Sequence, residues 1–566
     1  MSGDGTLEQI GAALATHPAV SAVTLNESKK FIDVTARSPS ALWQMTVAPH
    51  PGGGLPIIGV PRHSLIGSLA HVSHDGTVCV SDNEGLSVDA TRPGDVAAAA
   101  LSDALAVLEK SLSDYNAGDL TDLNDEFEGY WEALPGARRV DVHFALDDNT
   151  RKVQAFFGTG KLCAAIAEPA QLKRPTYGPI MRLRNRTDLA GTDAIYVALR
   201  SPIQPPSPTD PLSAAQVQRW LAQALHPERV QQILKSWPGR RSEAYLVFSQ
   251  PRSQGLSAFG VRFSSRGGRH PLIEAAGWAA HPLALSRHDA SHLRARGGAP
   301  NLLSKAHIAV IGCGSVGSRI AEQLAQSGVG KLTLVDPELF QAENIYRHVL
   351  GGEACGSYKV SALKFQFQRR FPQIDIEAAP VSLAEWSTIQ NLKSVSGIAI
   401  AIGKPQDERA FIKTLWSHGA MNLSTVTTWL EPLGIGGHSQ LTIPHHVGCL
   451  ECLYTNADAN SELTPKTGYT EPDQKISRNL TGCVGAFTPY SALDATQTAL
   501  IATRQLVASL LGESPPSYMA WRGPDTEFRK AGLKTTDWYR VLGMDKGADA
   551  AIEYSRVKCP VCGGTA

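Results

Sequence analysis

A run of apolar, mostly β-branched residues at 308–311 gives the clearest structural signal in the chain. Such runs are typical of strands that are buried on both faces of a parallel sheet. An amphipathic helical pattern follows and continues to Leu324, and a second apolar run at 331–335 ends at Asp336. This succession of strand, helix and strand predicts an α/β domain with a parallel sheet, which we expect to occupy residues 296–566.

The N-terminal part of the chain has shorter periodic stretches. They predict strands near 22–25, 31–36 and 42–47 and helices at 7–15 and 95–111. Glycine and proline residues at 50–61 indicate a turn-rich crossing. We therefore expect a small α+β domain over residues 1–120, followed by an acidic connection that begins within 114–131.

Residues 121–295 alternate between strand-like runs and loops. The runs lie at 138–146, 193–200, 243–249 and 257–265, and one helix is predicted at 214–225. A proline-rich loop occupies 201–211. No residue pattern in this portion indicates chemistry, and we expect a globular middle domain of the α/β or α+β class.

The composition favours an intracellular enzyme with several domains. A chain of 566 residues is too long for one hydrophobic core. Its 53 basic and 53 acidic residues cancel, so no net charge indicates nucleic acid or an anionic membrane as a partner. No apolar run approaches the roughly 20 residues of a membrane span, and the first residues lack the pattern of a secretory signal. We therefore expect a cytoplasmic protein.

Three glycines follow the first predicted strand of the C-terminal domain. Gly312, Gly314 and Gly317 form the pattern G-x-G-x-x-G at the start of a helix. In a Rossmann-like fold, such glycines let the backbone approach a phosphate, whose charge the helix N-terminus favours. An acidic residue at the end of the second strand, here Asp336, can hold ribose hydroxyls. Taken alone, this pattern fits any dinucleotide-binding enzyme.

Three polar residues after Asp336 narrow the choice of ligand. Asn344, Arg347 and Lys359 suit a triphosphate whose α-phosphorus is attacked, and a nicotinamide enzyme has no need for them. Their order resembles the ThiF/MoeB/ubiquitin-activating superfamily, whose members adenylate the C-terminal carboxylate of ubiquitin-like proteins. The resemblance implies that ATP binds the glycine loop together with these residues, and that Arg347 is catalytic. The alternative is a generic Rossmann oxidoreductase.

The same resemblance implies Mg²⁺, held by an aspartate a few residues before an arginine. The corresponding segment contains Arg409, but the expected acidic position falls at Gly403 or Lys404. Asp407 is the nearest aspartate, and it is displaced toward the arginine. The sequence therefore leaves the magnesium ligands open, with Lys404 as a candidate for neutralising phosphate charge.

Two C-x-x-C pairs predict a metal site in the C-terminal domain. One pair is Cys449 and Cys452, and the other is Cys559 and Cys562. Four thiolates are the ligand set of a tetrahedral structural Zn²⁺, which would tie the C-terminus back onto the domain. The same arrangement occurs in many ThiF/MoeB-type proteins. A redox role for the pairs is the alternative.

Cys483 is a candidate nucleophile. It lies after a polar loop and just before an alanine-rich helix, and a thiol near a helix N-terminus is more nucleophilic. The stretch resembles the segment after the crossover loop of the activating enzymes, which implies that Cys483 takes the acyl group from the adenylate. The alternative is a buried structural cysteine. Cys313 and Cys355 are expected to be packing residues.

Cys79 is a second candidate nucleophile, in the N-terminal domain. The sequence at 76–79, Gly-Thr-Val-Cys, and the turn upstream of it resemble the active-site region of ubiquitin-conjugating enzymes. The His-Pro-Asn of those enzymes is absent, and His71 or His74 is a candidate base or hydrogen-bond donor in its place. The alternative is a cysteine of the hydrophobic core.

Taken together, the domains resemble the bacterial conjugating–activating fusions of antiphage CBASS operons. The resemblance implies ATP-dependent activation of a partner's C-terminus, a thioester relay through Cys483 and Cys79, and conjugation to a target in antiviral defence. The implied partner is a cGAS/DncV-like nucleotidyltransferase or a ubiquitin-like protein, and we expect a homodimer. A different function stays open, in which the chain adenylates a sulfur-carrier protein and the N-terminal domain is only a binding module.

Overall fold

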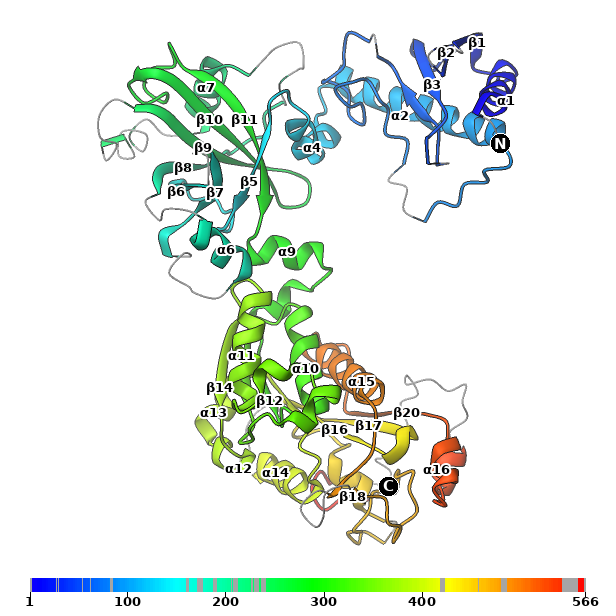
Figure 1. Ribbon diagram of the computed structural model, residues 1–566, viewed down its shortest axis with the longest axis vertical. Coiled ribbons are helices and arrows are strands. Elements are labelled where there is room, and N and C mark those ends of the chain that lie inside the picture. Colours follow the sequence, from blue (N-terminus) through cyan, green and yellow to red (C-terminus); the bar gives the residue numbers. More distant parts are fainter. Residues whose placement is uncertain are drawn as a thin grey trace. The chain divides into compact units, whose positions relative to one another are not determined.

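In the computed structural model, the chain forms two compact units (Figure 1). One unit comprises residues 1–174 and 182–288, and the other comprises 175–181 and 289–566. The described residues are 3–26, 28, 30–52, 54–61, 63–81, 85–158, 162–170, 177–186, 191–204, 206, 212–224, 228, 234–235, 241–417, 423–456, 458–479, 486–541 and 558–563. Among them, no helix combines the length and the apolar character that crossing a membrane requires.

The first unit begins with an antiparallel sheet covered by helices. Its strands pair in the order β1 (Val20–Asn26), β2 (Phe31–Arg37), β3 (Leu42–Ala48) and β4 (Ile57–Gly59), and its helices are α1 (Gly3–Ala15) and α2 (Pro93–Ala117). Alternate residues of β2 and β3, such as Val34 and Trp43, share a buried core with Leu101 of α2. The three predicted strands and both helices are confirmed, and the turn-rich crossing contains the additional strand β4.

Two short helices, α3 (Thr121–Asp125) and α4 (Phe127–Glu132), follow α2. The acidic stretch that is predicted to begin a connection is therefore helical. The reason is its apolar residues, because Leu123, Phe127 and Trp131 are 2%, 0% and 1% exposed. Their burial against other elements stabilises helices that the acidic composition alone does not predict.

A closed barrel of seven strands makes up the rest of the first unit. Around the barrel the order is β10 (Leu256–Gly268), β11 (Ala279–Arg287), β5 (Arg138–Val142), β7 (Cys163–Ala167), β6 (Arg151–Phe157), β8 (Thr192–Ala198) and β9 (Arg241–Pro251). The same stretch of chain contains the helices α6 (Gly178–Arg186) and α7 (Ala214–Ala224). The sequence predicts β5, β8, β9, β10 and α7 but misses β6, β7 and β11. Both β7 and β11 are rich in alanine, which has a low strand propensity.

The second unit is built on a seven-stranded sheet. Its order is β14 (Asp375–Ala379), β13 (Lys331–Val335), β12 (His307–Ile311), β15 (Gly397–Ile400), β16 (Ser424–Leu430), β17 (Gly436–Thr442) and β20 (Ser517–Arg522). The first five strands are parallel and the last two are antiparallel to their neighbours. A separate pair consists of β18 (Arg478–Asn479) and β19 (Ala486–Phe487).

Helices connect these strands. The α-helices are α9 (Ala290–Arg296), α10 (Ser315–Gln326), α11 (Lys359–Arg370), α12 (Leu383–Trp386), α13 (Ile389–Ser394), α14 (Pro405–Ser417), α15 (Ala492–Leu510), α16 (Thr526–Lys530) and α17 (Asp537–Val541). Short 3₁₀ helices are η2 (Asn301–Lys305), η3 (Ala342–Arg347), η4 (Gly352–Ala354), η5 (Pro432–Gly434) and η6 (Leu450–Tyr454).

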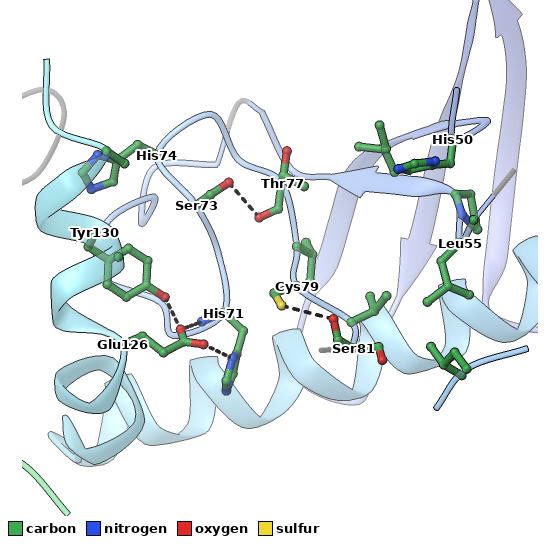
Figure 2. Close-up of a pocket in the computed structure, with 18 of the residues that line it drawn as sticks. His50, Leu55, His71, Ser73, His74, Thr77, Cys79, Ser81, Glu126 and Tyr130 are labelled. Carbon is green, nitrogen blue, oxygen red and sulfur yellow. Dashed lines mark hydrogen bonds and ion pairs between the residues drawn. The ribbon is translucent and has the colours of Figure 1, made fainter. Parts of the chain in front are cut away.

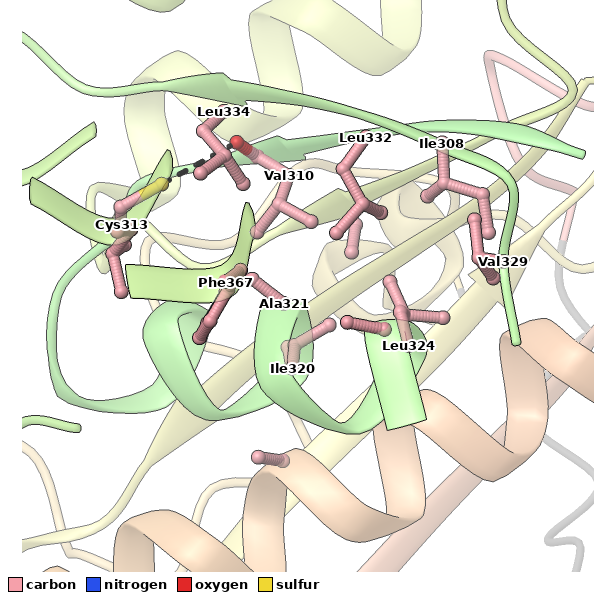
Figure 3. Packing of buried hydrophobic residues seen from close by; sticks show 14 of the residues in the cluster. Ile308, Val310, Cys313, Ile320, Ala321, Leu324, Val329, Leu332, Leu334 and Phe367 are labelled. Carbon is pink, nitrogen blue, oxygen red and sulfur yellow. Dashed lines mark hydrogen bonds between the residues drawn. The ribbon is translucent and has the colours of Figure 1, made fainter. Parts of the chain in front are cut away.

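Both faces of this sheet are covered, because successive side chains of a strand point to opposite faces. Figure 3 shows one face, where Ile308 and Leu332 pack against Ile320 of α10. On the other face, Ile398 belongs to a core that includes Phe411 of α14. The predicted Rossmann-like α/β class of this domain is confirmed.

Candidate active sites

The first candidate site is a cleft of about 790 Å³ at the carboxyl ends of β12 and β15. β13 pairs with one side of β12 and β15 with the other, so the order of the sheet changes direction here. Open α/β sheets bind their ligands at such a point. Gly314 and Ser315 line the cleft after β12, and residues 401–403 line it after β15.

The glycine loop forms one border of this cleft. Gly312 has a φ of +81°, and a Cβ there would lie 2.7 Å from the Ala401 carbonyl oxygen. A Cβ on Gly317 would lie 1.7 Å from the Gly312 carbonyl oxygen, so α10 packs too closely on the loop for a side chain. Gly314 differs, because a Cβ there would meet no protein atom within 4 Å. The open space beside it, at the N-terminus of α10, is suited to a phosphate.

Asp336 lies behind the glycine loop and is not among the described residues that line the cleft. Its carboxylate accepts hydrogen bonds from the Cys313 amide at 2.7 Å and from the Glu338 amide at 2.8 Å. The residue is 6% exposed, and this burial raises the pKa of its carboxyl group. Asp336 holds the loop in place, and its contact with ribose stays a prediction.

The other residues predicted to bind nucleotide come together at the cleft. Asn344, Arg347 and Lys359 all line it. Lys359 is the first residue of α11, and its ammonium group lies 2.5 Å from Glu338 Oε2. The Lys359 side chain is only 6% exposed, so its charge is directed at the cleft and at Glu338.

Tyr490 is an additional member of this group. The Arg347 guanidinium lies over the Tyr490 ring, 5.6 Å from its centroid. The Tyr490 hydroxyl is 2.7 Å from the hydroxyl of Ser315, the first residue of α10. Tyr490 therefore links the predicted catalytic arginine to the helix N-terminus. Nothing in the local sequence indicates this contact, because the two hydroxyls are 175 residues apart.

Glu408 is a buried carboxylate at the cleft that the sequence motif does not predict. It is 3% exposed, lines the cleft and accepts a hydrogen bond from the Gly403 amide at 3.0 Å. Burial raises the pKa of Glu408 to about 7. Asp407 and Lys404 are exposed and are not among the described residues that line the cleft. The motif places the acidic residue several positions before the arginine, whereas Glu408 directly precedes Arg409, so the linear spacing misses it.

Residues 464–476 contribute several side chains to the cleft, and Glu431 anchors this loop. Glu431 accepts hydrogen bonds from the Tyr469 amide at 2.8 Å and from the Thr470 hydroxyl at 2.7 Å. The buried imidazole of His438 lies 3.1 Å from the same carboxylate. Burial acts to raise the pKa of Glu431, but the interactions with His438, Tyr469 and Thr470 together outweigh it and the pKa is lowered. An ionised carboxylate therefore holds the loop.

Four cysteines from two distant segments meet next to η6. The Cys449 sulfur lies 4.0 Å from that of Cys452 and 3.7 Å from that of Cys559. The sulfurs of Cys452 and Cys562 are 3.5 Å apart, and all four lie within 4.8 Å of one another. Tetrahedral Zn–S bonds of about 2.3 Å place sulfurs roughly 3.8 Å apart, whereas a disulfide requires about 2.0 Å. The thiols therefore fit a zinc ion.

A buried ion pair ties the cysteine segment to α14. Glu451, between Cys449 and Cys452, is 1% exposed and accepts hydrogen bonds from Arg409 at 2.9 and 2.7 Å. The guanidinium group of Arg409 is therefore engaged in the ion pair with Glu451.

The remaining cysteines of the second unit differ in exposure. Cys313 is buried, as predicted, but Cys355 is exposed, so its predicted packing role is wrong. Cys483 lies outside the described residues.

The second candidate site is a pocket of about 980 Å³ around Cys79 in the first unit (Figure 2). The thiol is exposed, which excludes the alternative of a core cysteine, and its sulfur lies 3.6 Å from the Ser81 carbonyl oxygen. The preceding turn requires a glycine. Gly76 has a φ of +87°, and a Cβ there would lie 2.7 Å from the Pro61 Cα. The glycine upstream of the cysteine thus fixes the turn that presents the thiol.

His71 connects this turn to α4. Its Nδ1 lies 2.7 Å from Glu126 Oε1, and its amide donates to Glu126 Oε2 at 3.0 Å. The Tyr130 hydroxyl donates to Oε2 as well, at 2.6 Å. The hydrogen bond to Glu126 raises the pKa of His71, so His71 suits a charged donor better than a base. Burial acts to raise the pKa of Glu126, but the hydrogen bonds from His71 and Tyr130 lower it overall.

His74, the other candidate histidine, has different surroundings. Its ring stacks on Tyr130 with centroids 6.1 Å apart, and burial lowers its pKa. A neutral imidazole in this pocket suits a base. Both histidines are predicted from the sequence, but Glu126 and Tyr130 are not, because Glu126 lies 55 residues beyond His71 in the acidic stretch.

Comparison with known families identifies both domains. Residues 53–139 match prokaryotic E2 family B, and residues 294–522 match the ThiF family. The chain joins an E2-family domain to a ThiF-family domain. The ThiF match excludes the generic oxidoreductase that the glycine pattern left open.

Similar proteins cover only parts of the chain. The ATP-dependent ubiquitin transferase-like protein Cap2 of Pseudomonas aeruginosa is 28% identical over 219 residues, which are 37% of this chain and 37% of that protein. The adenylyltransferase and sulfurtransferase MOCS3 of Mus musculus is 38% identical over 84 residues, 15% of this chain and 18% of that protein. A crystal structure of E. coli MccB with MccA-N7isoASN shares 17% identity with a TM-score of 0.33, covering 46% of this chain and 69% of that chain. The chain thus spans little more than a third of the Cap2 relative's length.

The family matches can be placed on the sites. The E2 match contains Cys79, His71, Glu126 and Tyr130, so the principal groups of the second pocket lie inside one family domain. The ThiF match contains the first cysteine pair and the described lining residues of the first cleft except Thr536, and it ends before Cys559.

Proposed function

We propose that the chain activates the C-terminal carboxylate of a protein partner with ATP and then carries the acyl group on its own cysteines. One observation carries the proposal. A single chain holds a cleft lined by Arg347 and Lys359, with open space beside Gly314 at a helix N-terminus, and also a separate pocket with the exposed thiol of Cys79. The similarity to Cap2, whose name describes an ATP-dependent ubiquitin transferase-like protein, supports the same function.

In the first step, a carboxylate oxygen of the partner attacks the α-phosphorus of ATP. An acyl–oxygen–phosphorus bond forms, pyrophosphate leaves, and the product is an acyl-adenylate. The backbone at Gly314 and the N-terminus of α10 hold phosphate oxygens. Arg347 and Lys359 neutralise the negative charge that develops in the transition state.

Mg²⁺ would supply further charge neutralisation of the phosphates. Glu408 fits the role of its protein ligand, because it is a buried carboxylate at the cleft. A divalent cation favours the ionised form of this group, whereas without one its burial outweighs the backbone hydrogen bonds that it accepts and raises its pKa to about 7. Zn²⁺ would be held by the four clustered cysteines and would tie residues 558–563 to the ThiF domain.

In the second step, the acyl group moves to sulfur. The Cys483 thiolate attacks the acyl carbon, a C–S bond forms, and AMP leaves. The Cys79 thiolate then displaces Cys483 in the same way, and an amine of the target finally displaces Cys79 to give an amide. Because both thiols belong to one chain, the transfer between them is intramolecular. The role of Cys483 depends on its sequence setting alone.

The test uses the full chain with a candidate partner that has a free C-terminal tail, either a ubiquitin-like protein or a nucleotidyltransferase. We expect partner-dependent exchange of pyrophosphate into ATP, lowered about 100-fold or more by Arg347→Ala. We also expect a partner adduct on Cys79 that a reducing agent removes. Cys79→Ala should leave the partner on Cys483, and Cys483→Ala should block every thioester. Normal conjugation by both cysteine variants would contradict the relay.

A second function is favoured by a different observation, the similarity to MOCS3. In this alternative the chain adenylates a sulfur-carrier protein, and the E2 domain only binds it. Sulfur incorporation at the partner's C-terminus without any adduct on Cys79 would select the alternative. The exposed position of Cys79 in a pocket favours the relay. In either case we propose a cytoplasmic homodimer.

A further inference from the structure

The backbone next to Cys79 is held by hydrogen bonds that lead to one carboxylate. The Cys79 amide donates to the His71 carbonyl oxygen at 2.7 Å, and the His71 amide donates to Glu126 Oε2 at 3.0 Å. His71 thus contacts the candidate nucleophile through its carbonyl and Glu126 through its amide and its ring. Figure 2 shows Glu126 and Tyr130 facing His71 in the pocket that also contains Cys79.

His71 has an unfavourable backbone conformation. Its φ is +61°, in the left-handed region that residues with a Cβ seldom adopt. Such a conformation persists only where the surroundings enforce it. The two hydrogen bonds to Glu126 supply this constraint, because they fix both the amide and the ring of His71. Without them, fewer contacts, among them the bridge between Val72 and Val78, oppose a change to an ordinary φ, which would rotate the His71 carbonyl away from the Cys79 amide.

Glu126 is itself held firmly. The Tyr130 hydroxyl donates to it at 2.6 Å, one turn further along α4. The adjoining face of α4 carries Phe127 and Trp131, which are 0% and 1% exposed and belong to the barrel core. Glu128 of the same helix accepts a hydrogen bond from the Ala258 amide of β10 at 2.6 Å. The barrel therefore sets the position of Glu126.

We propose that Glu126 is a positioning residue for Cys79. Through His71 it fixes the segment that presents the thiol to the acyl group. This role rests on the proposed function of Cys79 as an acyl carrier. It acts through the backbone, so Glu126 need not touch the substrate.

The test measures hydrogen–deuterium exchange at the Cys79 amide in the full chain, with neither ATP nor a partner present. Glu126→Gln keeps the size of the side chain but leaves one acceptor oxygen for the three donors, the His71 amide, the His71 ring and the Tyr130 hydroxyl. We expect exchange at Cys79 to accelerate at least about tenfold, since its hydrogen bond depends on His71. Glu132→Gln is the matched control. Glu132 lies on the same helix and pairs with Arg139, and its substitution should leave the rate unchanged.

A second substitution separates positioning from general loosening of the helix. Glycine adopts a positive φ without strain. His71→Gly in the Glu126→Gln background should therefore restore slow exchange at Cys79. Unchanged exchange in Glu126→Gln, or no recovery in the double variant, would overturn the proposal.

The functional readout is transfer of the acyl group from loaded Cys79 to free lysine, measured in a single turnover. The rate should fall with Glu126→Gln and stay at the wild-type level in Glu132→Gln. Fast exchange with an unchanged transfer rate would also overturn the positioning role. If wild-type Cys79 never carries an acyl group while the exchange results hold, the proposed function fails and the structural role of Glu126 stands.

Discussion

Three carboxylates at the candidate sites differ in the groups that surround their negative charge. Glu126 and Glu431 each contact a histidine, at 2.7 and 3.1 Å, and their pKa values are lowered despite burial. Both hold segments that border a site, so their ionised state serves to fix a backbone. The hydrogen bonds that affect the pKa of Glu408 all come from backbone amides. Burial raises this pKa to about 7. Its charge is therefore free to respond to a cation in the cleft.

The pairing of His71 with Glu126 predicts a pH dependence of stability. The charged groups that face His71 are Glu126, Asp122 at 3.9 Å and Lys110, and the net effect raises its pKa above the ordinary 6.5. A raised pKa contributes stability below pH 6.5, and this contribution is lost as pH rises through the folded-state pKa. The lowered pKa of Glu126 contributes stability above pH 4.5. This contribution is lost as pH falls through the folded-state pKa of Glu126.

Thermal unfolding midpoints of the wild type and Glu126→Gln should therefore differ most between pH 4.5 and 6.5. The difference should shrink as pH rises further. Glu132→Gln serves as the reference for a lost carboxylate on the same helix. A difference that grows steadily above pH 6.5 would contradict the assignment of a charged His71.

At the scale of elements, the regular patterns of the sequence predict most of the two functional domains. The buried run at 308–311 and the glycines after it are local signals, because a parallel strand and a phosphate loop each need particular residues in series. The alternation of buried and exposed residues along β2 and β3 is likewise a signal that the local sequence carries. Strands such as β7 are missed because their alanines become buried only when the barrel closes.

The candidate sites were predictable only where a residue type has a fixed place along the chain. The glycine loop, the four clustered cysteines and Cys79 follow such local patterns. Glu126, Glu408 and Tyr490 do not, because their partners lie in other elements. The clearest case is α4, whose acidic sequence indicates a solvated connection, while its fold places Glu126 at the pocket and Phe127 in the barrel core.

The cysteine cluster is an element whose stability should depend on metal. Its two segments are 110 residues apart, and a bound Zn²⁺ would contribute folding energy because the ligands converge only in the folded chain. Cys559→Ser should abolish zinc binding, measured by elemental analysis, and lower the unfolding midpoint by roughly 5–10 °C. Cys355→Ser, at an exposed cysteine outside the cluster, is the control. Freshly purified wild-type protein without zinc would rule out the metal.

At the scale of the whole molecule, the E2 domain and the barrel belong to one compact unit, and α4 joins them. One face of this helix presents Glu126 and Tyr130 to the Cys79 pocket, and the other places Phe127 and Trp131 in the barrel core. The barrel has no chemistry of its own that the sequence or the described residues indicate. If Glu126 positions Cys79 as proposed, the contribution of the barrel is mechanical, since it fixes the helix from which the Cys79 segment is held.

This arrangement predicts that a change in the barrel core alters the backbone at Cys79. Trp131 packs on Phe259 with ring centroids 4.5 Å apart, and its Nε1 donates to the Leu283 carbonyl oxygen at 3.1 Å. Trp131→Ala removes both contacts and should cost about 3–5 kcal/mol of barrel stability. Trp131→Phe removes the hydrogen bond and part of the ring, so its effect should be smaller. Hydrogen exchange at the Cys79 amide should accelerate in the order wild type, Trp131→Phe, Trp131→Ala.

A second buried tryptophan of the barrel provides the comparison. Trp278 donates from Nε1 to the Arg269 carbonyl oxygen at 2.9 Å and its ring lies 6.5 Å from that of Phe263. Like Trp131, it donates from its indole nitrogen to a backbone carbonyl and belongs to the barrel core. Unlike Trp131, it does not lie on α4. Trp278→Phe should lower the unfolding midpoint without changing exchange at Cys79. If both tryptophan variants accelerate that exchange equally, the effect is a general loss of barrel stability and α4 has no special part in positioning the thiol.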